Sequence, residues 1–272
     1  MEGSGELKNL TDLCDALRAA ERVRIFGSAR RSAFLPSWDG AVLSLSSLSG
    51  VIAHDVDDQV VEVWAGTSVE ELQEEIGRHG QCLPLASGLP LVVSQQYGTV
   101  GGLLATNLPH ALWAQCGGPR DWTLGMTVVR ADGTSAKCGS KAVKSVAGYD
   151  AHKLFVGSRG SLGAIATVTL RTFPSRAVPQ HQVETLSDEE PTHVARTLRT
   201  DFEGARADAG RLVAADPASC TLWSLDEPIL PAESWMLGPR GAIVRPEQSA
   251  KLEDSARAVF DPTHKIAPGW QQ

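Results

Sequence analysis

The sequence has little of what marks a nucleic-acid, membrane or metal-binding protein. Its 25 Lys and Arg residues are outnumbered by 32 Asp and Glu, and the resulting net charge of −7 argues against a strongly anionic partner such as a nucleic acid. No apolar run approaches the length of a membrane span, and the first residues, "MEGSGELKNL", have neither the basic nor the apolar part of a secretory signal.

Cysteine and histidine are present but not in patterns that bind metals. The five cysteines are odd in number and scattered without a CxxC pair, which excludes a disulfide framework and a zinc or iron–sulfur motif. The seven histidines form no HxH or HxxxH pair. We therefore expect a cytoplasmic protein with no metal site built from protein ligands alone.

The hydrophobic pattern predicts a small mixed unit in the first part of the chain. A helix carries Leu10, Leu13, Cys14 and Leu17 on one face. Strands are predicted in "RVRIFG", "AVLSLSSL" and "QVVEVWAG", and a further helix in "TSVEELQEEIGRHG". That helix starts with a capping box, from either Thr67 with Glu70 or Ser68 with Glu71. With the short strand "QCLPL", the predicted order is αββ(β)βαβ.

A second unit follows, between about residue 95 and residue 175. "WTLGMTVVRADGTSAKCG" is typical of a hairpin around Asp132-Gly133, "GYDAHKLFVGSRG" is helix-like, and "SLGAIATVTLRTFP" indicates an alternating strand that Pro174 stops. The remaining chain is polar and acidic with one helix, then loop-rich through "TLWSLDEPILPAESWMLGPRGAIV", then a charged helix in "PEQSAKLEDSARAVF".

The stretch "QQYGTVGGLLATN" places three glycines just before a predicted helix. Such a turn leaves backbone N–H groups at the helix start, which together with the helix dipole suit a phosphate or pyrophosphate. The spacing is neither the P-loop nor the Rossmann pattern, so a nucleotide would be held in another fold. The alternative is a tight turn between two packed elements, and the residues alone leave both open.

Several segments in order resemble one family. "VEVWAGTSVEELQEEIGRHGQCLPL", "YGTVGGLLATN", "GPRDWTLGMTVVRADG" and "KSVAGYDAHKLFVGSRGSLGAIATVTLRTFP" are similar to the FAD-binding domain of the vanillyl-alcohol oxidase/para-cresol methylhydroxylase (PCMH) superfamily, and most similar to the FAD-binding subunit of glycolate oxidase. The resemblance implies an α+β, two-subdomain PCMH-type fold over residues 1–175, with subdomains of about 1–94 and 95–175. Residues 176–272 would form a reduced cap region and a C-terminal helix and tail.

The resemblance also implies which residues bind FAD. The first loop would contribute Gly27, Ser28, Ala29 and Arg30; the glycine turn Thr99, Gly101, Gly102 and Ala105; and "GSRGSLGAI" Ser158, Gly160, Leu162, Gly163 and Ile165. For "GSRGSLG", a helix end followed by a turn is the structural alternative.

The first loop departs from the family, in which an Arg-Gly-Gly-Gly-like run wraps the pyrophosphate. Here only Gly27 remains, and Ser28 and Ala29 are less free to adopt positive φ. The loop has no histidine for a covalent flavin link, so we expect non-covalent FAD.

Two functions are consistent with these features. The chain is either a flavoprotein subunit of a glycolate-oxidase-like 2-hydroxy-acid dehydrogenase, acting with a larger flavin subunit and an iron–sulfur subunit, or a cofactor-free domain that serves as an interaction or scaffold module. No catalytic residue can be assigned after Pro174. "TLWSLDEPILPAESWMLG" is a candidate partner surface, through Trp223 and Trp235, or folds back onto the flavin domain.

Overall fold

The computed structural model describes most of the chain up to residue 178 and parts of the remainder. The described residues are 6–29, 38–85, 98–107, 112–139, 150–178, 184–186, 193–196, 202–208, 210, 212–216, 221–224, 235–237, 243–244 and 247–267. Arg30 of the predicted first loop lies outside them.

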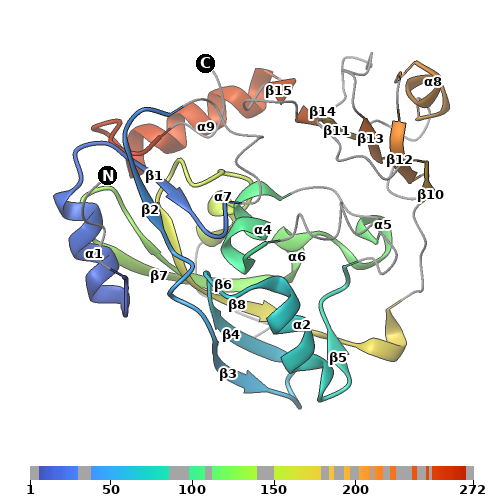
Figure 1. Ribbon diagram of the computed structural model, residues 1–272, viewed down its shortest axis with the longest axis horizontal. Coiled ribbons are helices and arrows are strands. Elements are labelled where there is room, and N and C mark those ends of the chain that lie inside the picture. The colour runs from blue at the N-terminus through green and yellow to red at the C-terminus, as the bar shows by residue number, and fades with distance from the viewer. Residues whose placement is uncertain are drawn as a thin grey trace.

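The centre of the molecule is a five-stranded antiparallel sheet in the order β3-β4-β8-β6-β7 (Figure 1). Its strands are β3 (Val51–Asp55), β4 (Val60–Trp64), β6 (Thr123–Val129), β7 (Ser135–Gly139) and β8 (Ala164–Arg171). The predicted hairpin around Asp132-Gly133 is confirmed as β6 and β7, and Gly133 has the positive φ of +77° that such a turn favours. The predicted order αββ(β)βαβ has one optional strand, and β3, between β2 and β4, corresponds to it.

Strand β8 is buried along almost its whole length because both faces of the sheet are covered. Ile165 and Val168 face a core shared with helices α2 (Val69–Gly77) and α4 (Val100–Thr106). Ala164 and Ala166 face the opposite core, which includes helix α1 (Leu10–Ala19). Side chains of successive strand residues point to opposite faces, so this central strand contributes to two cores at once.

Outside the central sheet, two small pairs of strands complete the first 178 residues. β1 (Val23–Phe26) pairs in parallel with β2 (Ala41–Ser44), and β5 (Gln81–Cys82) pairs antiparallel with β9 (Phe173–Pro174). The short helices are α5 (Trp113–Cys116), α6 (Pro119–Trp122), α7 (His152–Phe155) and the 3-10 turn η3 (Ser175–Ala177).

The local predictions hold where a cap or turn specifies them. Helix α2 begins after Ser68, whose Oγ accepts the Glu71 N–H at 3.0 Å, so the second of the two proposed caps is the one that forms. The helix-like stretch before Gly157 is shorter than predicted, because only His152–Phe155 is helical.

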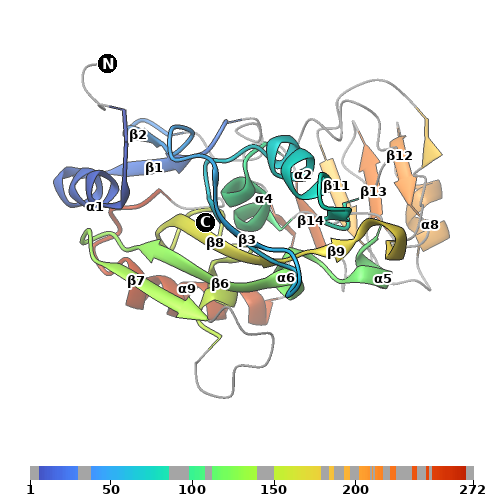
Figure 2. The same cartoon turned by 90° about the horizontal axis from the view of Figure 1, so that it is seen from below.

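The chain after residue 178 builds a second sheet, which lies with helix α8 (Phe202–Ala207) at one end of the molecule (Figures 1 and 2). Its order is β10-β12-β13-β11-β14-β15, from β10 (Glu184–Thr185), β11 (His193–Arg196), β12 (Leu212–Asp216), β13 (Thr221–Ser224), β14 (Trp235–Leu237) and β15 (Ile243–Val244). In the stretch predicted to be loop-rich, residues 221–244, the described residues form β13, β14 and β15, and the remainder lies outside the described residues. Strands of three or four residues between prolines are too short to give a period in the sequence.

Helix α9 (Glu247–Phe260) returns to the first part of the chain. The Phe260 ring lies edge-to-face on Phe155, with ring centroids 5.2 Å apart, and Ile266 beyond the helix is buried beside α1 and β1. The end of the chain therefore packs on the domain formed by its beginning.

Among the described helices, none is both long and apolar enough to cross a lipid bilayer. The four cysteines in the described part of the chain, Cys14, Cys82, Cys116 and Cys138, are free thiols.

Candidate cofactor site

Three segments far apart in the sequence meet at the ends of β1 and α4. A methyl group added to Gly27, just after β1, would lie 2.0 Å from Thr99 Oγ1, so the Gly27 backbone packs against the Thr99 side chain with no room for a side chain of its own. At the other end of α4, the Arg159 N–H donates to Ala105 O at 2.7 Å. The structure thus brings together the first loop, the glycine turn and the "GSRGSLG" turn.

The third segment also contacts β1 directly. A methyl group on Gly160, whose φ is +78°, would lie 3.8 Å from Ile25 O, in ordinary van der Waals contact. The Gly157 N–H donates to Leu104 O at 2.9 Å. Each of the three segments therefore touches the other two or the strand that leads into one of them.

The first turn of α4 does not have the unpaired N–H groups that its glycines suggested. The Val100 N–H donates to Thr67 O at 2.9 Å and the Gly101 N–H to Ala65 O at 2.8 Å. Thr99 caps the helix: its Oγ1 accepts the Gly102 N–H at 3.2 Å, and its carbonyl accepts the Leu103 N–H at 2.8 Å. The expectation of free donors at this helix start is therefore wrong, because Ala65, Thr67 and Thr99 of the same chain supply the acceptors.

Gly101 is a glycine for reasons of packing. A methyl group there would lie 2.8 Å from Ala65 Cβ and 3.0 Å from Ala65 O. Gly98 has a φ of +56°, and its carbonyl accepts the Val69 N–H at the start of α2. The alternative of a tight turn between packed elements thus accounts for these two glycines, and cofactor contact by Thr99, Gly101, Gly102 and Ala105 stays a prediction.

The first loop leaves two small side chains exposed at the meeting point. Ser28 and Ala29 are both exposed, and Ala29 has a φ of +56°, in the left-handed region that favours glycine. At Ala29 the loop therefore has a backbone conformation that a glycine would adopt with less strain.

The residues of the third segment divide into a surface turn and a buried part. Ser158 is buried, and its Oγ donates to Phe155 O at 2.8 Å. Leu162 and Ile165 belong to the hydrophobic core, and a methyl group on Gly163 would lie 2.7 Å from Val129 O. Among these predicted contacts, Gly160 is the one whose position faces β1.

Asn107 is a candidate residue that the sequence alone did not single out. It ends α4 in the left-handed conformation, with φ +47°, and lies against Gly157. Its Oδ1 is buried and has no hydrogen-bond partner in the described part of the chain. A buried acceptor without a partner is costly, and a donor on a bound cofactor would satisfy it. Asparagine at a helix end is the only sequence signal that precedes this observation.

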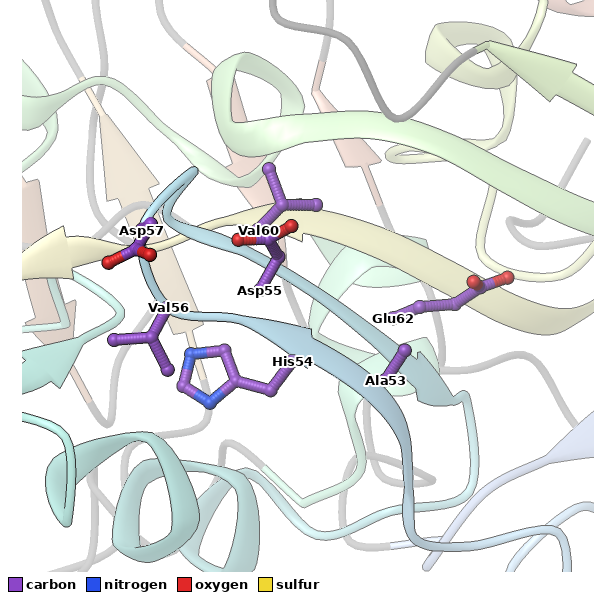
Figure 3. A pocket seen from close by; sticks show the side chains of 7 residues that line it. All are labelled: Ala53, His54, Asp55, Val56, Asp57, Val60 and Glu62. Atoms are coloured by element: carbon purple, nitrogen blue, oxygen red, sulfur yellow. The ribbon is translucent and has the colours of Figure 1, made fainter.

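A separate surface hollow of about 360 Å³ lies on the β3–β4 hairpin (Figure 3). Figure 3 shows the carboxylates of Asp55, Asp57 and Glu62 around it, together with the His54 ring. Among the described residues, no group of three or more His, Cys, Asp or Glu side chains has the arrangement of a metal site. The hollow is also remote in sequence from all three converging segments.

Comparisons with known proteins show which family the first half of the chain is similar to. Residues 6–139 match the family described as "FAD binding domain". The fold resembles alkyldihydroxyacetonephosphate synthase, at 17% sequence identity and a TM-score of 0.50, over 72% of this chain and 34% of that one. Residues 6–139 are thus similar to an FAD-binding domain, and the mixed helices and strands of the described residues are consistent with an α+β FAD-binding fold of the PCMH type.

Three similar proteins are named as a D-lactate dehydrogenase and as two subunits of glycolate oxidase. The chain is 32% identical over 148 residues to a D-lactate dehydrogenase of Archaeoglobus fulgidus, covering 54% of this chain and 32% of that protein. It is 25% identical over 225 residues to glycolate oxidase subunit GlcD of Bacillus subtilis, covering 83% and 44%. It is 29% identical over 140 residues to glycolate oxidase subunit GlcE of Escherichia coli, covering 50% and 37%. The chain thus spans between about a third and less than half of the length of these relatives.

Proposed function

We propose that this chain is the FAD-binding flavoprotein subunit of a glycolate-oxidase-like 2-hydroxy-acid dehydrogenase that acts in the cytoplasm with partner subunits. The observation that carries the proposal is that helix α4 links the three segments: Gly27 packs on Thr99 at the start of the helix, and the Arg159 N–H donates to Ala105 O near its end. Bound FAD would supply the acceptor for a hydride from the substrate alcohol carbon, and the protein would supply orientation and electrostatics.

The residues at this place fit a dinucleotide in three respects. Ser28 and Ala29 present small exposed side chains on a loop whose backbone already has a positive φ. In the "GSRGSLG" turn, Gly160 has no side chain and no atom closer than 3.8 Å to where a Cβ would lie, which leaves space for a ligand to approach its backbone. Asn107 Oδ1 offers a buried acceptor beside that turn. We assign the pyrophosphate to the Gly27–Ala29 loop and the neighbouring Thr99, and the adenine end to the turn around Gly160.

The alternative function, a cofactor-free interaction or scaffold module, is favoured by one specific observation. The N–H groups of the first turn of α4 already have protein acceptors, so this helix start holds its shape without a bound anion. A domain that binds no cofactor would need protein acceptors of this kind for the N–H groups at the helix start.

Flavin content separates the two functions. The purified chain should absorb in the flavin region, and acid precipitation should release the flavin into the supernatant, because the first loop contains no histidine for a covalent bond. Flavin that remained with the pellet would contradict non-covalent binding. No flavin in either fraction, even after incubation with excess FAD, would favour the scaffold module.

The partner subunits are proposed because groups for catalysis are not assignable here. A dehydrogenase of this class needs a base near the substrate hydroxyl and a cation for its carboxylate. Within the described residues after Pro174 we assign neither, and a larger flavin subunit and an iron–sulfur subunit would supply them. Co-purification with the products of neighbouring genes tests this assembly.

A further inference from the structure

The segment Asp261–Ala267, which follows α9, lies along the edge of β1 and makes an isolated parallel bridge to it, from Ile266 to Val23. The Val23 N–H donates to Lys265 O at 2.9 Å, and the Ala267 N–H donates to Val23 O at 2.8 Å. Ile266 is 1% exposed and packs in the same core as Val23. Strand β1 therefore has neighbours on both edges, one of which comes from the far end of the described chain.

One carboxylate holds this segment in shape. Asp261 is completely buried; its Oδ1 accepts the Lys265 N–H at 2.9 Å and its Oδ2 accepts the Ile266 N–H at 2.9 Å. Arg257, also buried, lies 3.7 Å from Oδ2 and donates from Nη2 to Ile266 O at 2.6 Å. A buried charge is tolerated when it is paired and hydrogen-bonded in this way, so the turn depends on Asp261.

The segment is also tied to two other elements through a lysine. Lys265 Nζ donates to Arg18 O at 3.1 Å, near the end of α1, and to Ala131 O at 3.2 Å, in the turn between β6 and β7. A cation near the carbonyl end of a helix is favourable there. The segment is therefore anchored to α1, β1 and the β6–β7 hairpin.

Strand β1 leads without interruption into the first loop of the cofactor site. Gly27 follows the strand directly and rests on Thr99, and Ile25 within the strand faces Gly160. Gly27 leaves no space against Thr99, so a displacement of β1 changes the contacts of all three segments at once.

We propose that Asp261 is a positioning residue of the FAD site. By holding the segment Asp261–Ala267 beside β1, it fixes the Gly27–Ala29 loop at the separation from Thr99 and Gly160 that cofactor binding requires. The inference rests on the proposed function, which places FAD at this loop.

The test compares Asp261→Asn with the control Asp254→Asn, an exposed residue on α9. FAD affinity is measured by titrating each folded apo-protein and following flavin fluorescence, and hydrogen exchange is followed at the amides of residues 23–29. Asp261→Asn should raise the Kd for FAD at least about tenfold and accelerate exchange in β1 and the loop. Asp254→Asn should leave both unchanged.

A second, milder variant keeps the proposal testable if Asp261→Asn does not fold. Lys265→Met removes the two Nζ hydrogen bonds but keeps the carboxylate, and it should also weaken FAD binding and accelerate exchange in β1. If either variant is folded and exchanges faster in β1 yet binds FAD as tightly as the wild type, Asp261 has only a structural role and the inference is wrong while the proposed function stands. If the wild type itself binds no FAD, the proposed function is wrong and the inference fails with it.

Discussion

At the scale of single residues, the first loop contains an alanine in a backbone conformation that favours glycine. Ala29 has a φ of +56°, and the resemblance described above implies a glycine in this loop. The left-handed conformation costs a non-glycine residue about 1–2 kcal/mol. The loop therefore carries a strain that a glycine would remove.

The change Ala29→Gly should stabilise the protein, by up to about 1 kcal/mol after the greater entropy of glycine in the unfolded chain is counted. It should not weaken FAD binding, because the loop conformation is retained. Urea unfolding and FAD titration measure the two effects. The control Ala16→Gly lies inside α1 and should destabilise by about 1 kcal/mol. A destabilised Ala29→Gly protein would mean that the loop does not hold this φ in solution.

His152 is a buried imidazole whose protonation affects the stability of the protein. It is 2% exposed, and burial lowers its pKa, against the opposing effects of Asp150 and of the hydrogen bond with Thr123 O at 3.2 Å. Since that partner is a carbonyl, Nε2 carries the proton and donates. The neutral form is therefore the one that the fold prefers.

This preference predicts a loss of stability in acid. Below the unfolded-state pKa of about 6.5, the unfolded chain binds a proton at this residue that the folded chain does not, so stability rises with pH through this range and falls as the pH drops below it. His152→Gln should make the dependence of the unfolding free energy on pH shallower below about 6.5. Urea unfolding at a series of pH values measures it, and identical slopes for the two proteins would contradict the assignment.

At the scale of elements, helix α4 is the part that connects the three segments of the site. Thr99 caps the start of the helix, and its side chain packs against Gly27. Asn107, in the left-handed conformation, ends the helix beside Gly157. The helix is only seven residues long, and such a short helix depends on caps and packing rather than on intrinsic propensity.

Removing the cap should therefore be measurable. Thr99→Val keeps the volume but loses the acceptor for the Gly102 N–H, and should destabilise the protein by about 1 kcal/mol. Thr99→Ser keeps the acceptor and should lose less. Equal unfolding free energies for the valine variant and the wild type would show that the Gly102 N–H finds another acceptor.

Because Gly101 of α4 packs tightly on Ala65, replacing it affects the stability of the protein as well as any contact with FAD. Gly101→Val places a branched side chain against Ala65, where even a methyl group is too close. Overpacking of this kind costs about 1–3 kcal/mol, so the variant should be destabilised whether or not FAD is present. Denaturant unfolding of the apo-protein checks this, and an apo-protein as stable as the wild type would leave cofactor contact as the reason for the glycine.

At the scale of the whole molecule, the chain combines an FAD-binding domain with a second sheet and a helix that returns to the domain. We expect the isolated, FAD-loaded chain to oxidise glycolate or lactate slowly, well below about 1 per second, because the base and the carboxylate-binding cation are not assignable in it. An assay with an artificial electron acceptor and several 2-hydroxy acids measures this. Turnover at ordinary enzyme rates would place a complete active site in this chain.

The sequence by itself determined the features that depend on neighbouring residues. A capped helix start at Thr67 or Ser68, the hairpin at Asp132-Gly133 and the helix of Leu13 and Leu17 were predictable, because their signals lie within a few residues of one another. The order of the glycine-rich segments also indicated the FAD-binding class.

Only the tertiary structure decided how those segments are used. The sequence predicted free N–H groups at the start of α4, but Ala65 and Thr67, from the end of another strand, supply acceptors for two of them. In the same way, only the fold shows that Asp261 is buried and that its carboxylate accepts the N–H groups of Lys265 and Ile266. A hydrogen-bond donor is satisfied by whichever acceptor the fold brings near, and that acceptor can come from any part of the chain, which local pattern does not encode.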